Sequence, residues 1–290
     1  IEEAHFIVSQ NNFKDQIIHL VINKIVVNEN IKIDKISKNK NIKSLILEIK
    51  FICLSKILIK EIKNQFKKNN LQVLNLYCSS YVKSISYKNT INNKGNIIFL
   101  DIGYERTSCL VFNNNEFEYF KSIPIGSNNI TKDISKVLKL NLEYAENIKI
   151  EFNKYITEIS FNKDDKNQIN PYSEILKKNF SIDLLKQIIN ARIDEITEMV
   201  IFDSNYMKNL NPKLKLKLAA TGGGSRLFSN NETLIKKKII HELFILSETD
   251  LNICEAGIRY HKSDESLHNK FMKNRIRSIS ILRKYTVTLN

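Results

Sequence analysis

Three consecutive glycines end an apolar run in the sequence Leu216-Lys217-Leu218-Ala219-Ala220-Thr221-Gly222-Gly223-Gly224-Ser225-Arg226-Leu227. The apolar residues before the glycines predict a β-strand. The chain has only seven glycines in 290 residues, so three together mark a point where the backbone turns tightly or comes close to another group. A backbone without side chains at this point would let a nucleotide lie flat against it.

A second predicted strand also ends at a glycine, in the sequence Ile97-Ile98-Phe99-Leu100-Asp101-Ile102-Gly103. We expect Asp101 to face a metal ion bound to phosphate, because carboxylate oxygens are ligands that hard cations prefer. Together, the two strand-and-glycine elements predict a nucleotide cleft. Each element alone also fits an ordinary tight turn, since short motifs give many false matches.

The composition is that of a soluble globular protein, with 42% hydrophobic and 26% charged residues. A chain of 290 residues has room for one large domain or for two of ordinary size, each with its own core. No apolar run approaches the roughly 18 residues that a membrane-spanning helix needs. The sequence begins with Ile1 and shows no signal peptide, which suggests a fragment of a longer protein.

The net charge of +14 has two explanations. A basic surface for nucleic acid or anionic membrane is the functional one. The simpler one is codon usage, because only seven of the 45 basic residues are arginine and the chain is rich in Lys, Ile and Asn. No motif supports nucleic-acid binding, so we expect no nucleic-acid partner.

The four cysteines, Cys53, Cys78, Cys109 and Cys254, lie far apart among apolar residues. No pair has the spacing of metal ligands, and the five histidines form no cluster with them. We expect reduced cysteines in the core of a cytosolic protein.

The hydrophobic pattern predicts a small α+β unit followed by a larger α/β unit. In the first, we expect helices over residues 2–10 and 56–69 and strands over 17–27, 31–33, 45–54 and 71–76. In the second, we expect helices over 77–87, 130–138, 142–152, 181–199 and 234–240 and strands over 96–101, 108–112, 117–123 and 214–220. Residues 162–171 are expected to form a loop, and Ser181 to cap the long helix that follows it.

Four segments, in this order, resemble the FtsA family of bacterial cell-division proteins, a branch of the actin-like ATPase superfamily. They are Asp101–Ser108, Ile123–Ile134, Ala145–Lys149 and Thr221–Ser225. The resemblance covers nearly the whole chain, because residues 17–28 and 45–76 are similar to the family's small inserted subdomain and residues 256–260 to its closing helix.

The resemblance implies an α/β, actin-like (ribonuclease H-like) ATPase fold with a small inserted α+β subdomain and with the N-terminal part missing. The implied domains are residues 1–76 for the α+β insert, 77–270 for the nucleotide-binding domain and 271–290 for a basic amphipathic tail. The family's first phosphate hairpin lies upstream of the segments present here.

The resemblance also implies that the chain binds ATP and Mg²⁺. Asp101 matches the family's magnesium ligand, and Glu146 and Lys149 match the pair that lines adenosine and ribose, although alone they also fit a solvated pair on one helix face. Gly126 and Thr131, with Asp133, match the segment that joins the two lobes. The full set of implied cofactor-binding residues is Asp101, Gly103, Thr107, Gly126, Glu146, Lys149, Thr221, Gly222, Gly223, Gly224 and Ser225.

The phosphate hairpin departs from the family pattern Asp-Ile-Gly-Gly-Gly-Thr-Thr. Tyr104 and Glu105 replace two glycines, Arg106 replaces a threonine, and Ser127 stands where a second glycine is usual. Non-glycine residues restrict the backbone angle φ, and the carboxylate of Glu105 adds negative charge near the phosphates. We therefore expect ATP binding to be retained and hydrolysis to be weak or lost.

Residues 270–285 have the pattern of a basic amphipathic helix. FtsA-like proteins end in a helix of this kind, which lies on anionic lipid. A terminal core helix or a strand ending at residues 286–289 is the alternative. The residues that we expect to contact the membrane are Phe271, Met272, Ile276, Arg277, Ile279, Leu282 and Lys284.

The resemblance finally implies an adaptor that polymerises like actin and captures the C-terminal peptide of the tubulin-like protein FtsZ. Arg192 matches a family arginine on the peptide-binding surface and Glu195 lies one turn further on, while a solvated charged face fits this pair equally well. We expect a cell-division adaptor that binds ATP, self-assembles and tethers FtsZ to the cytoplasmic face of the inner membrane at the division site. A weakly active actin-like ATPase and an actin-like scaffold of pilus assembly are the alternatives.

Overall fold

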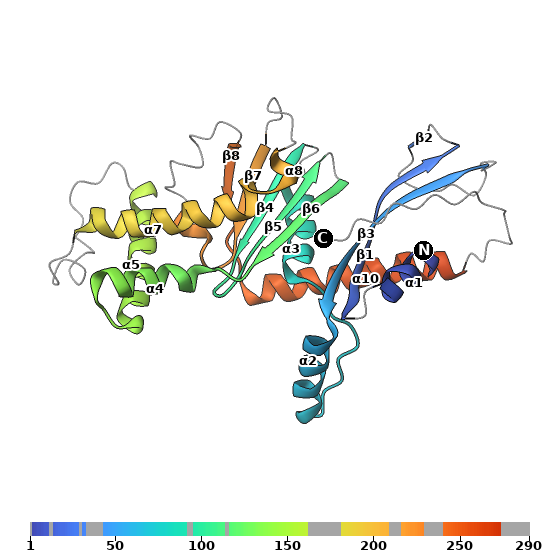
Figure 1. Cartoon of the computed structure of the whole chain (residues 1–290), viewed down its shortest axis with the longest axis horizontal. Helices are drawn as coiled ribbons and strands as arrows, with labels where there is room; N and C mark the ends of the chain where they lie inside the picture. Colours follow the sequence, from blue (N-terminus) through green and yellow to red (C-terminus); the bar gives the residue numbers. More distant parts are fainter. Residues whose placement is uncertain are drawn as a thin grey trace. The chain divides into compact units, whose positions relative to one another are not determined.

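The computed structural model describes residues 2–11, 14–28, 31–32, 43–91, 95–113, 116–161, 181–208, 216–228 and 240–273 (Figure 1). The chain divides into two compact units. Unit 1 comprises residues 1–90 and 251–290, and unit 2 comprises residues 91–250. The three domains expected from the sequence stay a prediction.

Unit 1 is built on a three-stranded antiparallel sheet in the order β2-β1-β3. The long pairing of β1 with β3 contains two irregularities in register, which fit the strong twist of a two-stranded ribbon. Its strands are β1 (Asp15–Val27), β2 (Ile31–Lys32) and β3 (Leu45–Ser55), and its helices are α1 (Glu2–Asn11), α2 (Lys56–Lys68), α3 (Ser79–Ile91) and α10 (Asp250–Lys273).

A buried histidine joins several elements of unit 1. His19 on β1 accepts a hydrogen bond at Nε2 from the backbone N–H of Cys78 (2.7 Å), so its ring proton is on Nδ1, which lies 3.2 Å from the hydroxyl of Tyr260 on α10. The rings of Tyr77, Tyr81 and Tyr260 surround it. Burial lowers the pKa of His19 to about 4, so this histidine is neutral at physiological pH.

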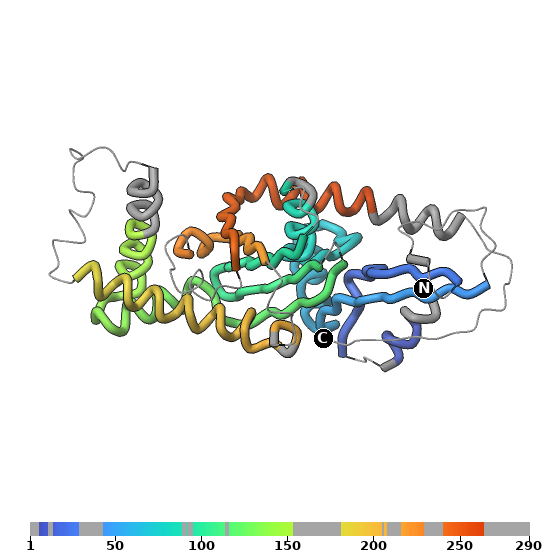
Figure 2. Tube along the Cα trace, turned by 90° about the horizontal axis from the view of Figure 1, so that it is seen from above, coloured from blue at the N-terminus to red at the C-terminus, as the bar shows by residue number. Residues whose placement is uncertain are grey.

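Unit 2 is built on a mixed five-stranded sheet in the order β6-β5-β4-β7-β8. Strand β5 runs antiparallel to both of its neighbours, β4 and β6, whereas β7 pairs in parallel with β4, and β8 in parallel with β7. Figure 2 shows α4, α5 and α7 grouped together beside this sheet. The strands are β4 (Asn96–Ile102), β5 (Thr107–Asn113), β6 (Glu116–Ile123), β7 (Leu216–Thr221) and β8 (Ile240–Ile245).

The helices of unit 2 pack on one face of the sheet. Alternate residues of β4, namely Ile98, Leu100 and Ile102, are fully buried against the apolar faces of α4, α5 and α7. The helices are α4 (Ser127–Leu138), α5 (Leu142–Phe161), α7 (Ile182–Thr197) and α8 (Asn205–Lys208), with a π-helical turn over Glu198–Phe202 and a 3₁₀ turn over Ser225–Phe228. Ser181 caps α7, as predicted, by accepting a hydrogen bond from the backbone N–H of Asp183.

Most of the predicted elements are confirmed within one to three residues, and two expectations are wrong. Residues 71–76 form no strand, because among the described residues no strand pairs with them, and Leu71 and Leu74 are exposed. Ile240 does not end a helix but begins strand β8, which the sequence did not predict. The rest of the helix expected over residues 234–240, and the loop expected over residues 162–171, lie outside the described residues.

The cysteines are free, but only one of them is a core residue. Cys109 on β5 is buried, and burial raises the pKa of its thiol to about 12. Cys53 and Cys78 are half-buried, whereas Cys254 is exposed on α10. The expectation of four core cysteines was therefore wrong for Cys254, because its helix turns that position outward.

Candidate nucleotide site

The two glycine elements predicted from the sequence adjoin each other in unit 2. Strand β4 pairs in parallel with β7, and the register places Asp101 opposite Thr221. Parallel strands end at the same edge of a sheet, so the chain leaves both strands at one place. The carboxylate of the half-buried Asp101 lies directly beside the first residue of the glycine turn, Gly222.

Two of the three glycines are required by packing. Gly222 has a left-handed backbone with φ +86°, and a Cβ atom there would lie 2.5 Å from the carbonyl oxygen of Ile102 and 2.9 Å from Oδ1 of Asp101. A Cβ atom on Gly224 would lie 2.6 Å from the Ile102 side chain. Both glycines therefore let the turn lie close against the end of β4.

The middle glycine, Gly223, is not required by packing within the protein. A Cβ atom on Gly223 would have no neighbouring atom within 4 Å, and its φ lies outside the left-handed region. A side chain would fit there without strain. The absence of one leaves a bare stretch of backbone facing open space, which is the feature that a flat ligand needs.

The hairpin between β4 and β5 closes with only the first of the three glycines of the family pattern, Gly103. Its turn is held by a 2.8 Å hydrogen bond from the N–H of Gly103 to the carbonyl of Arg106. Tyr104, Glu105 and Arg106 are exposed, and none of them is among the residues with positive φ. The three replacing residues therefore do not strain the backbone of the turn.

The N-terminus of α4 is attached to this hairpin turn. The N–H groups of Ser127 and Asn128 donate to the carbonyls of Gly103 and Tyr104, both at 2.9 Å, and the Asn128 side chain donates to Glu105 at 2.7 Å. A Cβ atom on Gly126 would lie 2.4 Å from the Tyr104 carbonyl. A glycine at position 126 is therefore what lets the helix begin so close to the hairpin.

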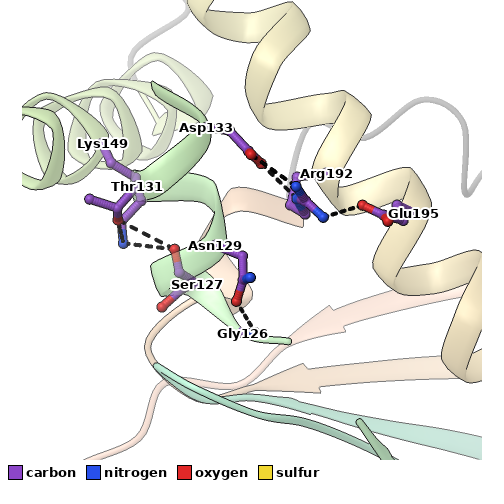
Figure 3. Close-up of polar contacts among 8 residues, drawn as sticks. All are labelled: Gly126, Ser127, Asn129, Thr131, Asp133, Lys149, Arg192 and Glu195. Atoms are coloured by element: carbon purple, nitrogen blue, oxygen red, sulfur yellow. Dashed lines mark hydrogen bonds and ion pairs between the residues drawn. The ribbon is translucent and has the colours of Figure 1, made fainter. Parts of the chain in front are cut away.

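Of the predicted pair on α5, Lys149 faces α4 (Figure 3), and Glu146 bonds to Lys149 and to Thr131. The ammonium of Lys149 is buried, and its three protons match three acceptors: Oε2 of Glu146 at 2.8 Å, the hydroxyl of Thr131 at 2.9 Å and the carbonyl of Ser127 at 3.2 Å. Lys149 is therefore saturated by the protein itself. Glu146 is half-exposed, and the Thr131 hydroxyl donates to the same Oε2, so its other oxygen is the one available to a ligand hydroxyl.

Arg192 and Glu195 lie on α7, and Arg192 is connected to Asp133 on α4 (Figure 3). Arg192 donates from Nε to Oδ2 of Asp133 at 2.6 Å and from Nη2 to Oδ1 at 2.8 Å, and from Nη1 to Glu195. The hydrogen bonds that Arg192 donates to Asp133, with the charges of both carboxylates, raise the pKa of Arg192 above its ordinary value.

Several residues around the turn were not singled out by sequence reasoning. Asn128 and Asn129 both bond backbone or side-chain groups at the start of α4, with the N–H of Gly126 donating to Asn129 at 3.1 Å. Their signal in the sequence is weak, since an Asn-Asn pair at a helix start is common. Thr107, Thr221 and Ser225, which were predicted, are buried at the ends of β5 and β7 and at the start of the 3₁₀ turn.

The residues present fit a nucleotide with magnesium. The buried hydroxyls of Thr107, opposite Ile102, and of Thr221, opposite Asp101, have no hydrogen-bond partner within the described part of the chain. The same ranges contain no cluster of three or more His, Cys, Asp or Glu that would hold a metal alone. Mg²⁺ is commonly bound by one or two carboxylates together with phosphate oxygens, and Asp101 is placed to supply such a carboxylate.

The predicted membrane residues are not tested by the structure. Phe271 and Met272 belong to the last turn of α10, and Ile276, Arg277, Ile279, Leu282 and Lys284 lie outside the described residues. Among the helices that are described, none is both long enough and apolar enough to cross a bilayer.

The mixed sheet with its flanking helices and paired glycine turns defines an actin-like (ribonuclease H-like) α/β fold. A solved PilM-PilN type IV pilus biogenesis complex shares the fold, with a TM-score of 0.51 over 88% of this chain and 68% of that one at 13% identity. The family model of the cell division protein FtsA matches residues 98–259. The chain belongs to the FtsA family of cell-division proteins.

The sequence relatives are distant and longer. FtsA of Buchnera aphidicola subsp. Baizongia pistaciae is 28% identical over 163 residues, which cover 52% of this chain and 38% of the relative. FtsA of Bacillus subtilis is 34% identical over 105 residues, covering 36% and 23%, and FtsA of Porphyromonas gingivalis is 25% identical over 194 residues, covering 65% and 36%. The chain thus spans less than two fifths of the length of these curated relatives.

Proposed function

We propose that the chain is a cell-division adaptor that binds ATP with Mg²⁺ as a structural cofactor, self-assembles, and tethers FtsZ filaments to the membrane. The observation that carries the proposal is the contact between Asp101 and the glycine turn at Gly222, with open backbone at Gly223. The family to which the chain belongs supports the role in cell division.

In this proposal the nucleotide lies along Gly222–Gly224. Glu146 accepts a hydrogen bond from a ribose hydroxyl, and Lys149 holds the Glu146 carboxylate in place. The hairpin turn at residues 103–106 faces the phosphates with its backbone. Each of these groups binds or orients the nucleotide in the position that it has in the structure.

Magnesium, when bound, would neutralise phosphate charge, and Asp101 would be its protein ligand. The exposed carboxylate of Glu105 adds negative charge to the hairpin that would face the phosphates. Its hydrogen bond to Asn128 directs the carboxylate toward α4 but does not remove its charge. We therefore propose that ATP hydrolysis is weak or absent. The residues present supply binding and orientation, and we assign no catalytic base to the site.

The proposed partner surface for the FtsZ peptide is the part of α7 around Arg192. A guanidinium has five N–H donors, and Asp133 and Glu195 take three of them. The other two are available to a peptide carboxylate. Arg192 can therefore bind such a group without releasing Asp133.

The proposed location is the cytoplasmic face of the inner membrane at the division site, with residues 271–290 as the contact with anionic lipid. The basic and apolar pattern of that segment supports the proposal. The likeness to the PilM-PilN complex, at 13% identity, shows the fold alone and does not favour a pilus scaffold.

Two measurements test the proposed function. In the first, ATP with Mg²⁺ is titrated into the chain, and the expected result is a rise in melting temperature with ligand concentration. In the second, an FtsZ C-terminal peptide on beads captures the chain, and Arg192→Gln weakens capture while Lys186→Gln, on the same helix, does not. A melting temperature that does not change with ATP would contradict the nucleotide role. Failure of the FtsZ peptide to capture the chain would contradict the adaptor role.

A further inference from the structure

Helix α4 connects the candidate site to α7. At its start, the backbone N–H groups of Ser127 and Asn128 hold the hairpin turn. Asp133 follows six residues after Ser127, about 9 Å along the helix axis at 1.5 Å per residue. The same rigid helix therefore carries the hairpin contact at one end and the Arg192 contact nearer its middle.

The contact between Asp133 and Arg192 fixes geometry as well as charge (Figure 3). It consists of two hydrogen bonds between planar groups, 2.6 and 2.8 Å long. Such a bidentate pair sets both the distance and the rotation of the two groups, which a single ion pair does not. The Arg192 side chain is 22% exposed and Asp133 27%, so water screens the pair only in part.

We propose that Arg192 is a positioning residue for the nucleotide site, acting through Asp133 and α4. This inference rests on the proposed function. Arg192 does not touch the nucleotide. It holds α4 at the distance from α7 at which Ser127 and Asn128 reach the carbonyls of Gly103 and Tyr104.

The effect is expected to be partial. Lys149 on α5 holds the other side of α4 through Thr131 and the carbonyl of Ser127. Loss of Arg192 would therefore leave α4 folded and attached to α5, but free to tilt. The tilt lengthens the two hydrogen bonds to the hairpin, and the turn that faces the phosphates loses its fixed shape.

The test compares Arg192→Gln, Asp133→Asn and the double variant with Lys186→Gln, which removes one positive charge from an exposed site on the same helix. ATP affinity is measured by equilibrium titration with Mg²⁺. Each single variant should weaken binding about tenfold, the double variant no more than either single one, and Lys186→Gln should match the unmodified chain. Arg192→Lys, which cannot form the bidentate pair, should bind with intermediate affinity.

A second readout does not depend on ATP. Amide hydrogen exchange at Ser127 and Asn128 should be faster in Arg192→Gln, while the amides of β4 keep their protection. Affinity within twofold of the unmodified chain, or unchanged exchange at both amides, would overturn the positioning role. If the unmodified chain binds no ATP but exchange at Ser127 and Asn128 responds to Arg192, the nucleotide function fails while the mechanical link from Arg192 to the hairpin stands.

Discussion

Asp101 and Gly222 lie against each other although 121 positions separate them in the sequence, with the carboxylate oxygen Oδ1 2.9 Å from where a Gly222 side chain would begin. The parallel pairing of β4 and β7 produces this contact. The acid and the glycine turn therefore occupy fixed places at one edge of the sheet, and their separate roles can be tested by changing the glycines one at a time.

Gly222→Ala is expected to destabilise unit 2, by about 2 kcal/mol, because alanine is strained at φ +86° and its Cβ would lie 2.5 Å from the Ile102 carbonyl. Denaturant unfolding measures this loss. Gly223→Ala is the matched control for stability, because its Cβ meets no atom, and its free energy of unfolding should change by less than about 0.5 kcal/mol.

Gly223→Ala should instead weaken ATP binding. The methyl group would stand between the backbone and a nucleotide that lies flat against it, and we expect an affinity loss of at least about tenfold, or 1.4 kcal/mol. Titration with ATP and Mg²⁺ measures it. Equal affinity in the variant and the unmodified chain would place the nucleotide elsewhere.

Lys149→Met should destabilise the chain by about 2 kcal/mol, because the buried carbonyl of Ser127 loses one of its donors and the charge of Glu146 loses its ion-pair partner. Half-exposure of Glu146 moderates the cost. Adding Glu146→Gln should recover part of the loss, since the two side chains act as a pair. Strictly additive effects in denaturant unfolding would show that they do not.

The stability of unit 1 should fall as the pH is lowered from about 6.5 toward 4. Burial lowers the pKa of His19 to about 4 from an ordinary 6.5, so in this window the unfolded chain takes up a proton that the folded chain refuses. The contribution of neutral His19 to the free energy of unfolding is complete above pH 6.5. Between pH 6.5 and 4 it decreases by about 1.4 kcal/mol per pH unit, for a total loss of roughly 3 kcal/mol.

Urea unfolding at pH 7.5 and 4.5 measures this dependence, and His19→Gln separates it from the carboxylates that titrate in the same range. The variant should be less stable at pH 7.5, because it loses the packing of the ring among three tyrosines. Its stability should change less between the two pH values. An identical pH dependence in both proteins would mean that His19 is not buried as described.

Removal of residues 270–290 should abolish co-sedimentation with vesicles that contain anionic lipid. Each basic residue of the segment contributes about 1 kcal/mol near such a surface, so binding should also weaken with salt. Arg277→Gln with Lys284→Gln should reduce binding, whereas Ser280→Gln should not. Full binding by the shortened chain would place any membrane contact in another segment.

The sequence pattern predicted strands β4 to β7 and helices α4, α5 and α7 of unit 2, because β-branched runs, glycine turns and the spacing of apolar residues on α7 are local signals. It also predicted that Asp101 and the three glycines lie at one cleft, and the structure confirms that Asp101 lies beside Gly222, while their binding roles stay a prediction. It could not show that Lys149 is saturated by Thr131 and Ser127, nor that Arg192 binds Asp133. Those contacts depend on how α4, α5 and α7 pack, and no local pattern records that.

The failures have the same origin. Residues 71–76 alternate apolar and polar side chains in part, as strands do, yet a strand exists only where another strand pairs with it, and none of the described strands does. Strand β8 is the opposite case. Its exposed His241 and Glu242 interrupt the alternation of apolar and polar residues typical of a strand, yet the segment forms a strand because β7 pairs with it.

The pairing register of β4 with β7 also explains how the hairpin can change while the site persists. A slip of one residue would turn Asp101 to the opposite face of the sheet, so the buried strands preserve its alignment with Gly222. The loop between β4 and β5 carries no such constraint. Exposed residues such as Tyr104, Glu105 and Arg106 can therefore be exchanged there without changing the pairing that holds Asp101 beside Gly222.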